Sequence, residues 1–204
     1  NWLECHQRVQ EHRRRLPGTC SQGSTVQFIE FLRHWARNPA MVGAVAPSSR
    51  RLARAMARGI EDASLIVELG SGTGAITDEL VRHCDQRRMV LIEPDATLAR
   101  HLSRRYPQAR VMACCAHELP EFFAQLPEDA VLVSSLPFRS LPPEVSGPTI
   151  ELLLGLLGAG RQRRLIQYTY HPRAPFQVPR GFHWHRRERV LGNLPPAGVW
   201  ELCA

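Results

Sequence analysis

The sequence predicts an α/β fold built on one doubly wound, mostly parallel sheet. Short apolar runs alternate with stretches of helical periodicity along most of the 204 residues, and one strand-to-helix junction is rich in glycine. Strands that alternate with helices are joined by helical crossovers, so the strands lie parallel. Because 44% of the residues are hydrophobic, a chain of this length can bury the core of a single domain.

An amphipathic helix is expected near the N-terminus, over residues 26–38. Apolar side chains recur there at helical spacing opposite a polar stripe, and Pro39 disfavours helix at the residue before it. We therefore expect residues 1–40 to form a helical extension that packs on the sheet or covers the site as a membrane-contacting lid. Residues 41–204 are expected to form the domain itself.

A second helix is expected from Pro47 to about Gly59. Ser48 and Ser49 offer hydroxyl groups that can cap its N-terminus. One side of this helix can pack on a core, because apolar residues recur along it. The other side gathers basic residues that face either solvent or an anionic surface, namely Arg50, Arg51, Arg54 and Arg58.

Seven apolar runs predict the strands of the sheet. They cover residues 65–67, 89–92, 111–112, 130–133, 165–170, 181–191 and 198–202. Helices are expected between the first five runs, beginning at Ala75 and then over residues 96–105, 118–125 and 144–157. No helical pattern separates the last two runs, so they predict an antiparallel pair that closes the sheet at the C-terminal end.

The charge of the chain points to an anionic partner. Every one of the 26 basic residues is arginine, and the formal net charge is +7, which favours lipid surfaces, nucleic acid or phosphate-bearing substrates. The apolar run at 150–160 is shorter than the roughly 20 residues that cross a bilayer. No export signal is visible, so we expect a cytoplasmic protein with reduced cysteines. His183 and His185 lack a completing ligand at suitable spacing, so no metal is expected.

The strongest candidate for a binding site is the glycine-rich turn at residues 68–74, Glu-Leu-Gly-Ser-Gly-Thr-Gly. Small residues allow a ligand to approach the backbone, and the helix that follows offers unpaired N–H groups at its N-terminus. Glu93 lies nineteen residues beyond Gly74, at the end of the next predicted strand. A carboxylate at that point can accept hydrogen bonds from both hydroxyls of a ribose.

This pattern resembles the first two motifs of the seven-strand, Rossmann-like class I methyltransferases, which use S-adenosyl-L-methionine. Further segments resemble the soluble bacterial phospholipid N-methyltransferases and, more distantly, the ribosomal RNA adenine dimethyltransferases. These segments are residues 31–35, 38–39, 43–45, 47–49, 134–137, 167–170 and 193–197. The resemblance implies a seven-stranded sheet with helices on both faces, S-adenosyl-L-methionine as the cofactor and S-adenosyl-L-homocysteine as its product.

The resemblance also assigns residues to the cofactor. They are Ser48, Ser49, Glu68, Gly70, Ser71, Gly72, Thr73, Gly74, Glu93, Pro94, Cys115, Ala116, Ser134 and Leu136. Glu68 and the glycines would meet the methionine end, and Glu93 would meet the ribose. The family usually carries an acidic residue after the third strand to bind the adenine amino group, where this chain has Cys115. His117, Glu118 or a backbone carbonyl are the alternatives.

The acceptor side of the site departs from the relatives that methylate nucleic acid. Those relatives carry Asn or Asp followed by Pro and an aromatic residue, whereas this chain has Ser-Leu-Pro-Phe at residues 135–138. The missing amide favours a lipid amine over an RNA base. Tyr168, Tyr170 or His171 could accept the proton, directly or by relay. The aromatic faces of Tyr168, Tyr170 or Trp200 could hold the methylated cation, and Ser135 is a further candidate catalytic residue. Arg173 and Arg180 could pair with a lipid phosphate.

We therefore expect an enzyme that methylates phosphatidylethanolamine to its mono-, di- and trimethylated forms, the last being phosphatidylcholine. It would associate peripherally with the anionic cytoplasmic face of the inner membrane and would need no metal and no nucleic acid. The alternatives are methylation of an RNA adenine, methylation of another amine lipid such as ornithine lipid, and a relative that kept the fold without the activity.

Overall fold

The computed structural model describes residues 47–141, 143–160, 162–193 and 195–204. The expected helix at residues 26–38, and with it the extension at residues 1–40, lies outside these ranges. The first described helix is α4, Pro47–Ala57, close to its expected bounds. The arginines on its outer side are exposed, as the sequence predicts.

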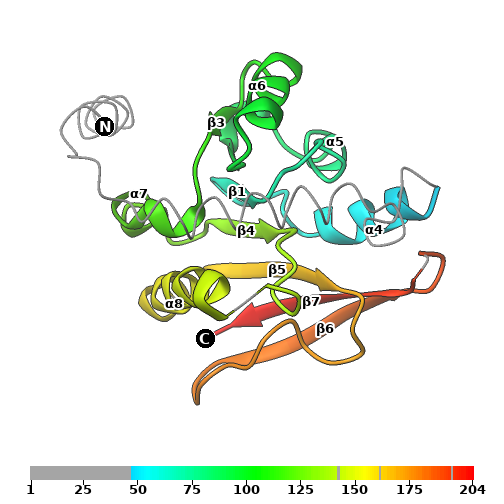
Figure 1. Ribbon diagram of the computed structural model, residues 1–204, viewed down its shortest axis with the longest axis vertical. Coiled ribbons are helices and arrows are strands. Elements are labelled where there is room, and N and C mark those ends of the chain that lie inside the picture. Colours follow the sequence, from blue (N-terminus) through cyan, green and yellow to red (C-terminus); the bar gives the residue numbers. More distant parts are fainter. Residues whose placement is uncertain (1–46, 142, 161, 194) are drawn as a thin grey trace.

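A seven-stranded sheet forms the centre of the domain, with the strand order β3-β2-β1-β4-β5-β7-β6 (Figure 1). The strands are β1 (Ile66–Leu69), β2 (Met89–Ile92), β3 (Arg110–Met112), β4 (Val131–Ser134), β5 (Arg164–Thr169), β6 (His183–Val190) and β7 (Ala197–Cys203). Neighbours among β1 to β5 pair in parallel, and β7 is antiparallel to both β5 and β6. The predicted doubly wound sheet and its antiparallel C-terminal pair are confirmed.

Helices cover both faces of the sheet, so the central strands are apolar on both sides. Side chains of α4, α5 (Thr77–Leu80) and α6 (Ala96–Arg105) share one buried cluster with the sheet. Those of α7 (Pro120–Ala124) and α8 (Pro143–Ala159) share the other. Two short 3-10 turns, η1 (Gln86–Arg88) and η2 (Ala116–Glu118), precede β2 and α7. None of the described helices is long and apolar enough to cross a membrane.

The helix expected from Ala75 starts later than the sequence suggests. Gly74 has a φ of +87°, which is outside the helical region, and the chain becomes regular helix only at Thr77. By contrast, α6 begins where expected, because the Asp95 carboxylate accepts hydrogen bonds from the backbone N–H groups of Thr97 and Leu98. The Asp95 cap therefore fixes the start of α6, whereas the conformation of Gly74 delays the start of α5.

The carboxyl ends of the parallel strands meet at one edge of the sheet. Leu69 of β1 pairs with Ile92 of β2 and with Ser134 of β4, which in turn pairs with Gln167 of β5. The segments that follow these residues therefore lie beside one another. This edge brings the glycine turn, Glu93 and the loop after β4 together, and ligands of open α/β sheets bind at such an edge.

Candidate active site

The glycine turn is built so that one of its residues leaves room for a ligand. Gly70, Gly72 and Gly74 all have a positive φ, at 71°, 56° and 87°. A Cβ at Gly70 would lie 2.8 Å from a Leu136 methyl, and one at Gly74 would lie 2.8 Å from the Tyr106 hydroxyl oxygen. A Cβ at Gly72 would meet nothing closer than 4.0 Å. Close packing therefore requires glycine at positions 70 and 74, whereas Gly72 faces open space.

Glu93 ties the glycine turn to the end of β2. One carboxylate oxygen accepts a hydrogen bond from the backbone N–H of Gly72 at 2.8 Å, and the other accepts one from Asp95 at 2.9 Å. The side chain is buried, and burial raises the pKa of its carboxyl group. Each carboxylate oxygen can accept a further hydrogen bond. Glu93 can therefore receive ribose hydroxyls beside Gly72.

Glu68 is a fully buried acid on β1. One of its oxygens accepts a hydrogen bond from the Thr77 hydroxyl at 2.7 Å. The Ser71 hydroxyl lies near this carboxyl group and lowers its pKa, but among the described residues neither that hydroxyl nor the second oxygen of Glu68 makes a hydrogen bond of good geometry. Burial raises the pKa of Glu68 to about 8, so the carboxyl group is largely protonated at neutral pH. Unpaired buried polar atoms are costly, and these two fit the charged methionine end of the expected cofactor.

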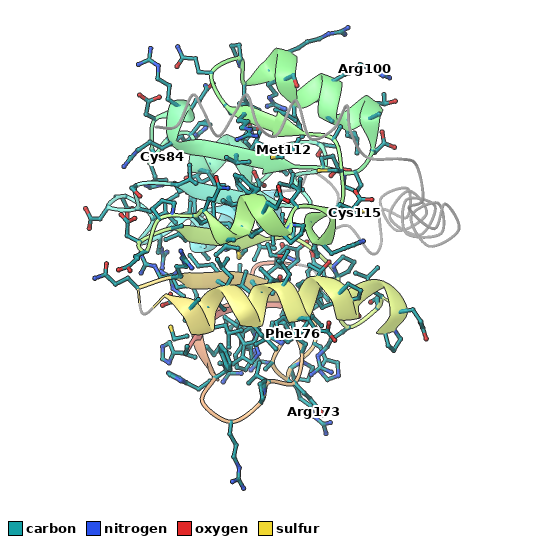
Figure 2. The ribbon with its side chains drawn as sticks, turned by 90° about the vertical axis from the view of Figure 1, so that its left-hand side faces the viewer. Cys84, Arg100, Met112, Cys115, Arg173 and Phe176 are labelled. Atoms are coloured by element: carbon teal, nitrogen blue, oxygen red, sulfur yellow. The ribbon has the colours of Figure 1, made fainter. Side chains whose placement is uncertain are left out.

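The adenine end of the site differs from the family pattern as the sequence indicates. Cys115 and Ala116 are buried at the start of η2, and the Cys115 backbone N–H donates to the Glu118 carboxylate at 2.8 Å. His117 faces α8 instead, 3.4 Å from the Thr149 hydroxyl. His117 and Glu118 were the two side chains expected to replace the missing acid at position 115. Of these, Glu118 is the one that contacts Cys115. Figure 2 labels Cys115, which follows β3 in the chain.

Cys115, His117 and Glu118 also form the one group of potential metal ligands among the described residues. Their ligand atoms lie within 4.8 Å of one another. All three come from the single turn η2, and the Glu118 carboxylate is already used to cap it. We attribute the cluster to the capping of this turn.

A cavity of about 350 Å³ lies between the ends of β4 and β5, and we call it the acceptor pocket. It brings together all four predicted catalytic residues. It is lined by Ser135, Leu136, Pro137, Phe138, Arg139, Ser140, Gln167, Tyr168, Thr169, Tyr170, His171 and Pro175. The pocket adjoins the glycine turn, because the Ser135 backbone N–H donates to the Leu69 carbonyl at 2.9 Å and Leu136 packs over Gly70.

Tyr168 and Tyr170 give the acceptor pocket an aromatic wall. Their ring centroids are 5.5 Å apart and their planes meet at 73°. Burial raises the pKa of both phenols, and for Tyr168 the neighbouring Tyr170 adds to the rise. Both side chains therefore stay neutral at physiological pH. They offer ring faces and hydroxyl groups to a substrate, but not a phenolate base.

His171 enters the pocket as a hydrogen-bond donor. Its Nδ1 accepts a hydrogen bond from the Arg173 backbone N–H at 3.1 Å, so the lone pair of that nitrogen is in use. When the ring is neutral, this contact places its hydrogen on Nε2.

A second cavity of about 620 Å³ adjoins the acceptor pocket, and we call it the aromatic hollow. The two share Phe138, Arg139 and Pro175, and the hollow adds Arg173, Ala174, Phe176, Gln177, Val178 and Trp184. The Phe176 ring packs edge-on against those of Phe138 and Trp184, with centroids 5.1 and 5.0 Å apart. Arg173 and Phe176 lie beyond α8 from Cys115 (Figure 2).

The two arginines expected near a lipid phosphate lie in different places. Arg173 lines the aromatic hollow. Arg180 is exposed before β6 and lines neither the hollow nor the acceptor pocket. Sequence reasoning missed Arg139, which lines both cavities and whose Nε donates to the Ala174 carbonyl at 2.8 Å. Its position directly after the Ser-Leu-Pro-Phe segment is the signal that could have found it.

The other expected cofactor residues lie on or near the same edge. Ser134 ends β4, and its buried hydroxyl accepts a hydrogen bond from a backbone N–H two residues later. Pro94 follows Glu93, and Thr73 is exposed at the tip of the glycine turn. Residues 48 and 49, the two serines, lie in the first turn of α4. Ser134 is thus a buried member of this set at the carboxyl edge of the sheet.

The strand order, the glycine turn after β1 and the acid after β2 together define an S-adenosylmethionine-dependent methyltransferase. The fold is shared with 1,6-didemethyltoxoflavin-N1-methyltransferase of Burkholderia thailandensis, which was solved with S-adenosylhomocysteine bound. The TM-score is 0.60 and the identity 14%, over 92% of this chain and 91% of that one. A methyltransferase from Geobacter sulfurreducens matches with a TM-score of 0.54 and 16% identity, over 97% of each chain.

The amino-acid sequence narrows the class to a family. Ornithine lipid N-methyltransferase of Singulisphaera acidiphila is 32% identical over 187 residues, which cover 85% of this chain and 94% of that protein. The chain belongs to the methyltransferase family of that enzyme. Ribosomal RNA small subunit methyltransferase A of Bordetella pertussis is 34% identical over 99 residues, 48% of this chain and 34% of that protein. No family model matches the chain.

Proposed function

We propose that this methyltransferase acts on the primary amine of a lipid that also carries an anionic group. Ornithine lipid, with a carboxylate, and phosphatidylethanolamine, with a phosphate, share this chemistry. The observation that carries the proposal is the pairing of two adjoining cavities: a neutral aromatic pocket, and an apolar hollow flanked by Arg139 and Arg173. Membership of a family that contains an ornithine lipid N-methyltransferase supports it.

The glycine turn and two acids, Glu68 and Glu93, would bind the methyl donor. Glu93 would hold the ribose beside Gly72, and Glu68 with Ser71 would meet the methionine end of S-adenosylmethionine. The bound cofactor supplies an electrophilic methyl group on its sulfonium sulfur. Since methyl transfer is an in-line displacement, the chain mainly has to align the two reactants and exclude water.

The acceptor pocket suits an amine that must be neutral to react and becomes cationic as it reacts. Among the described residues, its lining contains no carboxylate that would hold the substrate as an ammonium ion. The faces of Tyr168 and Tyr170 can stabilise the methylated cation. Their raised pKa values keep them from taking the proton, which leaves through water instead.

The aromatic hollow suits the rest of the lipid. Arg139 and Arg173 can pair with its carboxylate or phosphate, because a guanidinium group matches either anion. The rings of Phe138, Phe176 and Trp184 offer an apolar surface to the start of an acyl chain. The substrate would then lie across both cavities, with its amine nearest the glycine turn.

We also propose that the chain contacts the cytoplasmic face of the membrane peripherally. The outer side of α4 and the residue that follows it carry four exposed arginines. Of these, Arg54 pairs with Glu79 at 3.6 Å and Arg58 with Glu188 at 2.6 Å. Exposed arginines near a surface of anionic lipid each add modestly to binding. Because two of the four are partly neutralised, this contact would be weak and salt-sensitive.

The proposal is tested by incubating the full chain and S-adenosylmethionine with vesicles that contain ornithine lipid, phosphatidylethanolamine or neither. Mass spectrometry should find one or more added methyl groups on at least one amine lipid and none on the amine-free vesicles. Ribosomal RNA serves as the competing acceptor, since one relative is an RNA methyltransferase. Methylated RNA with unmodified lipids, from a chain that binds S-adenosylhomocysteine, would overturn the proposal.

A further inference from the structure

Gln167 is a buried amide in the wall of the acceptor pocket that the proposed chemistry has not yet used. It lies on β5, where its side chain is 1% exposed, and it is one of the residues that line the pocket. The strand register pairs it with Ser134, the last residue of β4. The amide therefore lies one strand away from the loop where nucleic-acid relatives carry their Asn or Asp.

The orientation of this amide is fixed by its own hydrogen bonds. Nε2 donates to the Leu136 carbonyl at 3.0 Å and to the Tyr168 carbonyl at 2.8 Å. A flipped amide would place its oxygen against two carbonyl oxygens, so the nitrogen must occupy this position. Oε1 is consequently the atom left over, and among the described residues it has no hydrogen-bond partner.

An unpaired buried carbonyl oxygen lowers stability unless a ligand satisfies it. The partner must be a hydrogen-bond donor, because Oε1 can only accept. The proposed substrate brings such a donor in the N–H groups of its amine. The two anchored hydrogen bonds hold the acceptor ready, so no side chain has to be reoriented when the substrate binds.

We propose that Gln167 Oε1 accepts a hydrogen bond from the substrate amine and orients its lone pair for methyl transfer. This inference rests on the proposed function. The substrate ammonium first gives a proton to water. The amine lone pair then forms the N–C bond, while the C–S bond breaks and leaves its electron pair on sulfur. The nitrogen gains positive charge as it reacts, which strengthens its N–H donation to Oε1, so the contact favours the transition state.

The number of N–H groups limits where this hydrogen bond can act. A neutral primary amine has two, a monomethylated amine has one, and a dimethylated amine has none. Gln167 therefore assists the first and second transfers and contributes nothing to a third. A residue that only supported the fold would affect all three transfers alike.

The test compares Gln167→Met, which keeps the side-chain length without the amide, with Gln167→Asn, which withdraws the amide by one methylene. Gln162→Met, at an exposed glutamine before β5, is the matched control. For both Gln167 variants kcat/KM on unmethylated and monomethylated lipid should fall about tenfold, the effect of losing one good hydrogen bond. Affinity for S-adenosylhomocysteine should change little, and any activity on dimethylated lipid should persist. Tm should fall by a few degrees, because the Leu136 and Tyr168 carbonyls lose their donor. Full activity on the unmethylated lipid, or an equal loss on all lipids, would overturn the inference.

A second measurement keeps this test apart from that of the proposed function. Sinefungin is a cofactor analogue that carries a primary amine in place of the sulfonium methyl. By calorimetry, Gln167→Met should bind sinefungin several-fold more weakly than the wild-type chain and S-adenosylhomocysteine equally well. Unchanged affinity for both ligands would overturn the role of Gln167 whatever the lipid assay gives. A wild-type chain that methylates no amine lipid would instead overturn the proposed function.

Discussion

The two halves of the candidate site differ in whether acidic side chains line them. The donor half, at the ends of β1 and β2, contains two buried acids, Glu68 and Glu93, that are held by hydrogen bonds to the turn and its helix. The acceptor half, at the ends of β4 and β5, is lined by aromatic rings, hydroxyls, the amide of Gln167 and the guanidinium of Arg139, and among the described residues it contains no carboxylate. One edge of one sheet thus has an acidic side and a side without acids.

The difference follows from what each half has to bind. The donor half would bind a molecule with fixed charges and sugar hydroxyls, and carboxylates suit both. The acceptor half would bind an amine that reacts only after it has lost a proton. A nearby carboxylate would raise the pKa of that amine and keep it unreactive. A pocket lined without acids therefore suits the amine, just as the acids of the donor half suit the cofactor.

The largest effect should come from filling the open space at Gly72. In Gly72→Ala the new Cβ meets no protein atom within less than 4.0 Å but enters the space where the cofactor would lie. We expect affinity for S-adenosylhomocysteine to fall at least about a hundredfold by calorimetry, with a stability loss of about 1–2 kcal/mol from the positive φ. Gly74→Ala is the matched comparison, because its Cβ would strike Tyr106; it should lose more stability. Normal binding by Gly72→Ala would show that the turn does not hold the cofactor.

Placing a carboxylate in the acceptor half should have the next largest effect. Ser135→Asp puts a carboxylate beside Tyr168 and Tyr170, where it would hold the substrate as an ammonium ion. We expect kcat/KM at pH 7 to fall about tenfold and to recover as the pH is raised toward 9, because one unit of pKa shift is a tenfold change in the neutral amine. Ser135→Asn is the neutral control. A pH profile identical in the two variants would contradict the electrostatic reading of this half.

Removing a titratable acid from the donor half should give a smaller effect that depends on pH. Glu68 has a pKa of about 8 in the fold against an ordinary value of 4.5, so the folded chain holds a proton there that the unfolded chain releases. Its contribution to stability is complete below pH 4.5 and is lost as pH rises through 8. In thermal melts, Tm should therefore fall between pH 5 and 8, and less so in Glu68→Gln.

The same carboxyl group should couple the pH to cofactor binding. The α-ammonium group of the methionine end favours ionised Glu68, so affinity for S-adenosylhomocysteine should rise several-fold from pH 6 to pH 8. Calorimetry in buffers with different ionisation enthalpies should detect proton release. Glu68→Gln should remove both the rise and the proton release. A variant that keeps the pH dependence would place the titrating group elsewhere.

The smallest effect should come from the arginines beside the acceptor half. Arg173→Ala should raise KM for an anionic amine lipid about two- to fivefold, with less effect at high salt because exposed charges are screened. Arg180→Ala carries the same charge change outside both cavities and should leave KM nearly unaltered. Equal effects of the two variants would indicate general attraction to the membrane in place of a specific contact.

The donor half could be read from the sequence because it is local. Its glycines and both acids lie on two consecutive strand ends, and the spacing between them is visible in the chain. The same holds for the seven strands, whose apolar runs are continuous. The late start of α5 could not be read, because it depends on the positive φ of Gly74 rather than on the helical periodicity that follows.

Much of the acceptor half could not be read from the sequence because it is assembled from distant segments. The family resemblance was enough to predict four of its residues, namely Ser135, Tyr168, Tyr170 and His171. The role of Gln167 depends on two carbonyls that hold its amide, one of them from the loop after β4. The aromatic hollow joins that loop to the segment after β5 and to β6. The donor character of His171 depends on a backbone N–H whose position only the fold sets.

The edge strands of the sheet affect whether the chain associates with itself at high concentration. A strand with an open side can pair with another molecule, and aggregation often begins there. Among the described residues, the edge strands are β3, which has three residues, and β6, which has a bulge between Arg186 and Glu188 and exposes half of its side chains. Both strands are therefore poor templates for strand addition. Replacing the charged residues of β6 with apolar ones should leave methyl transfer intact while promoting self-association, measurable by light scattering.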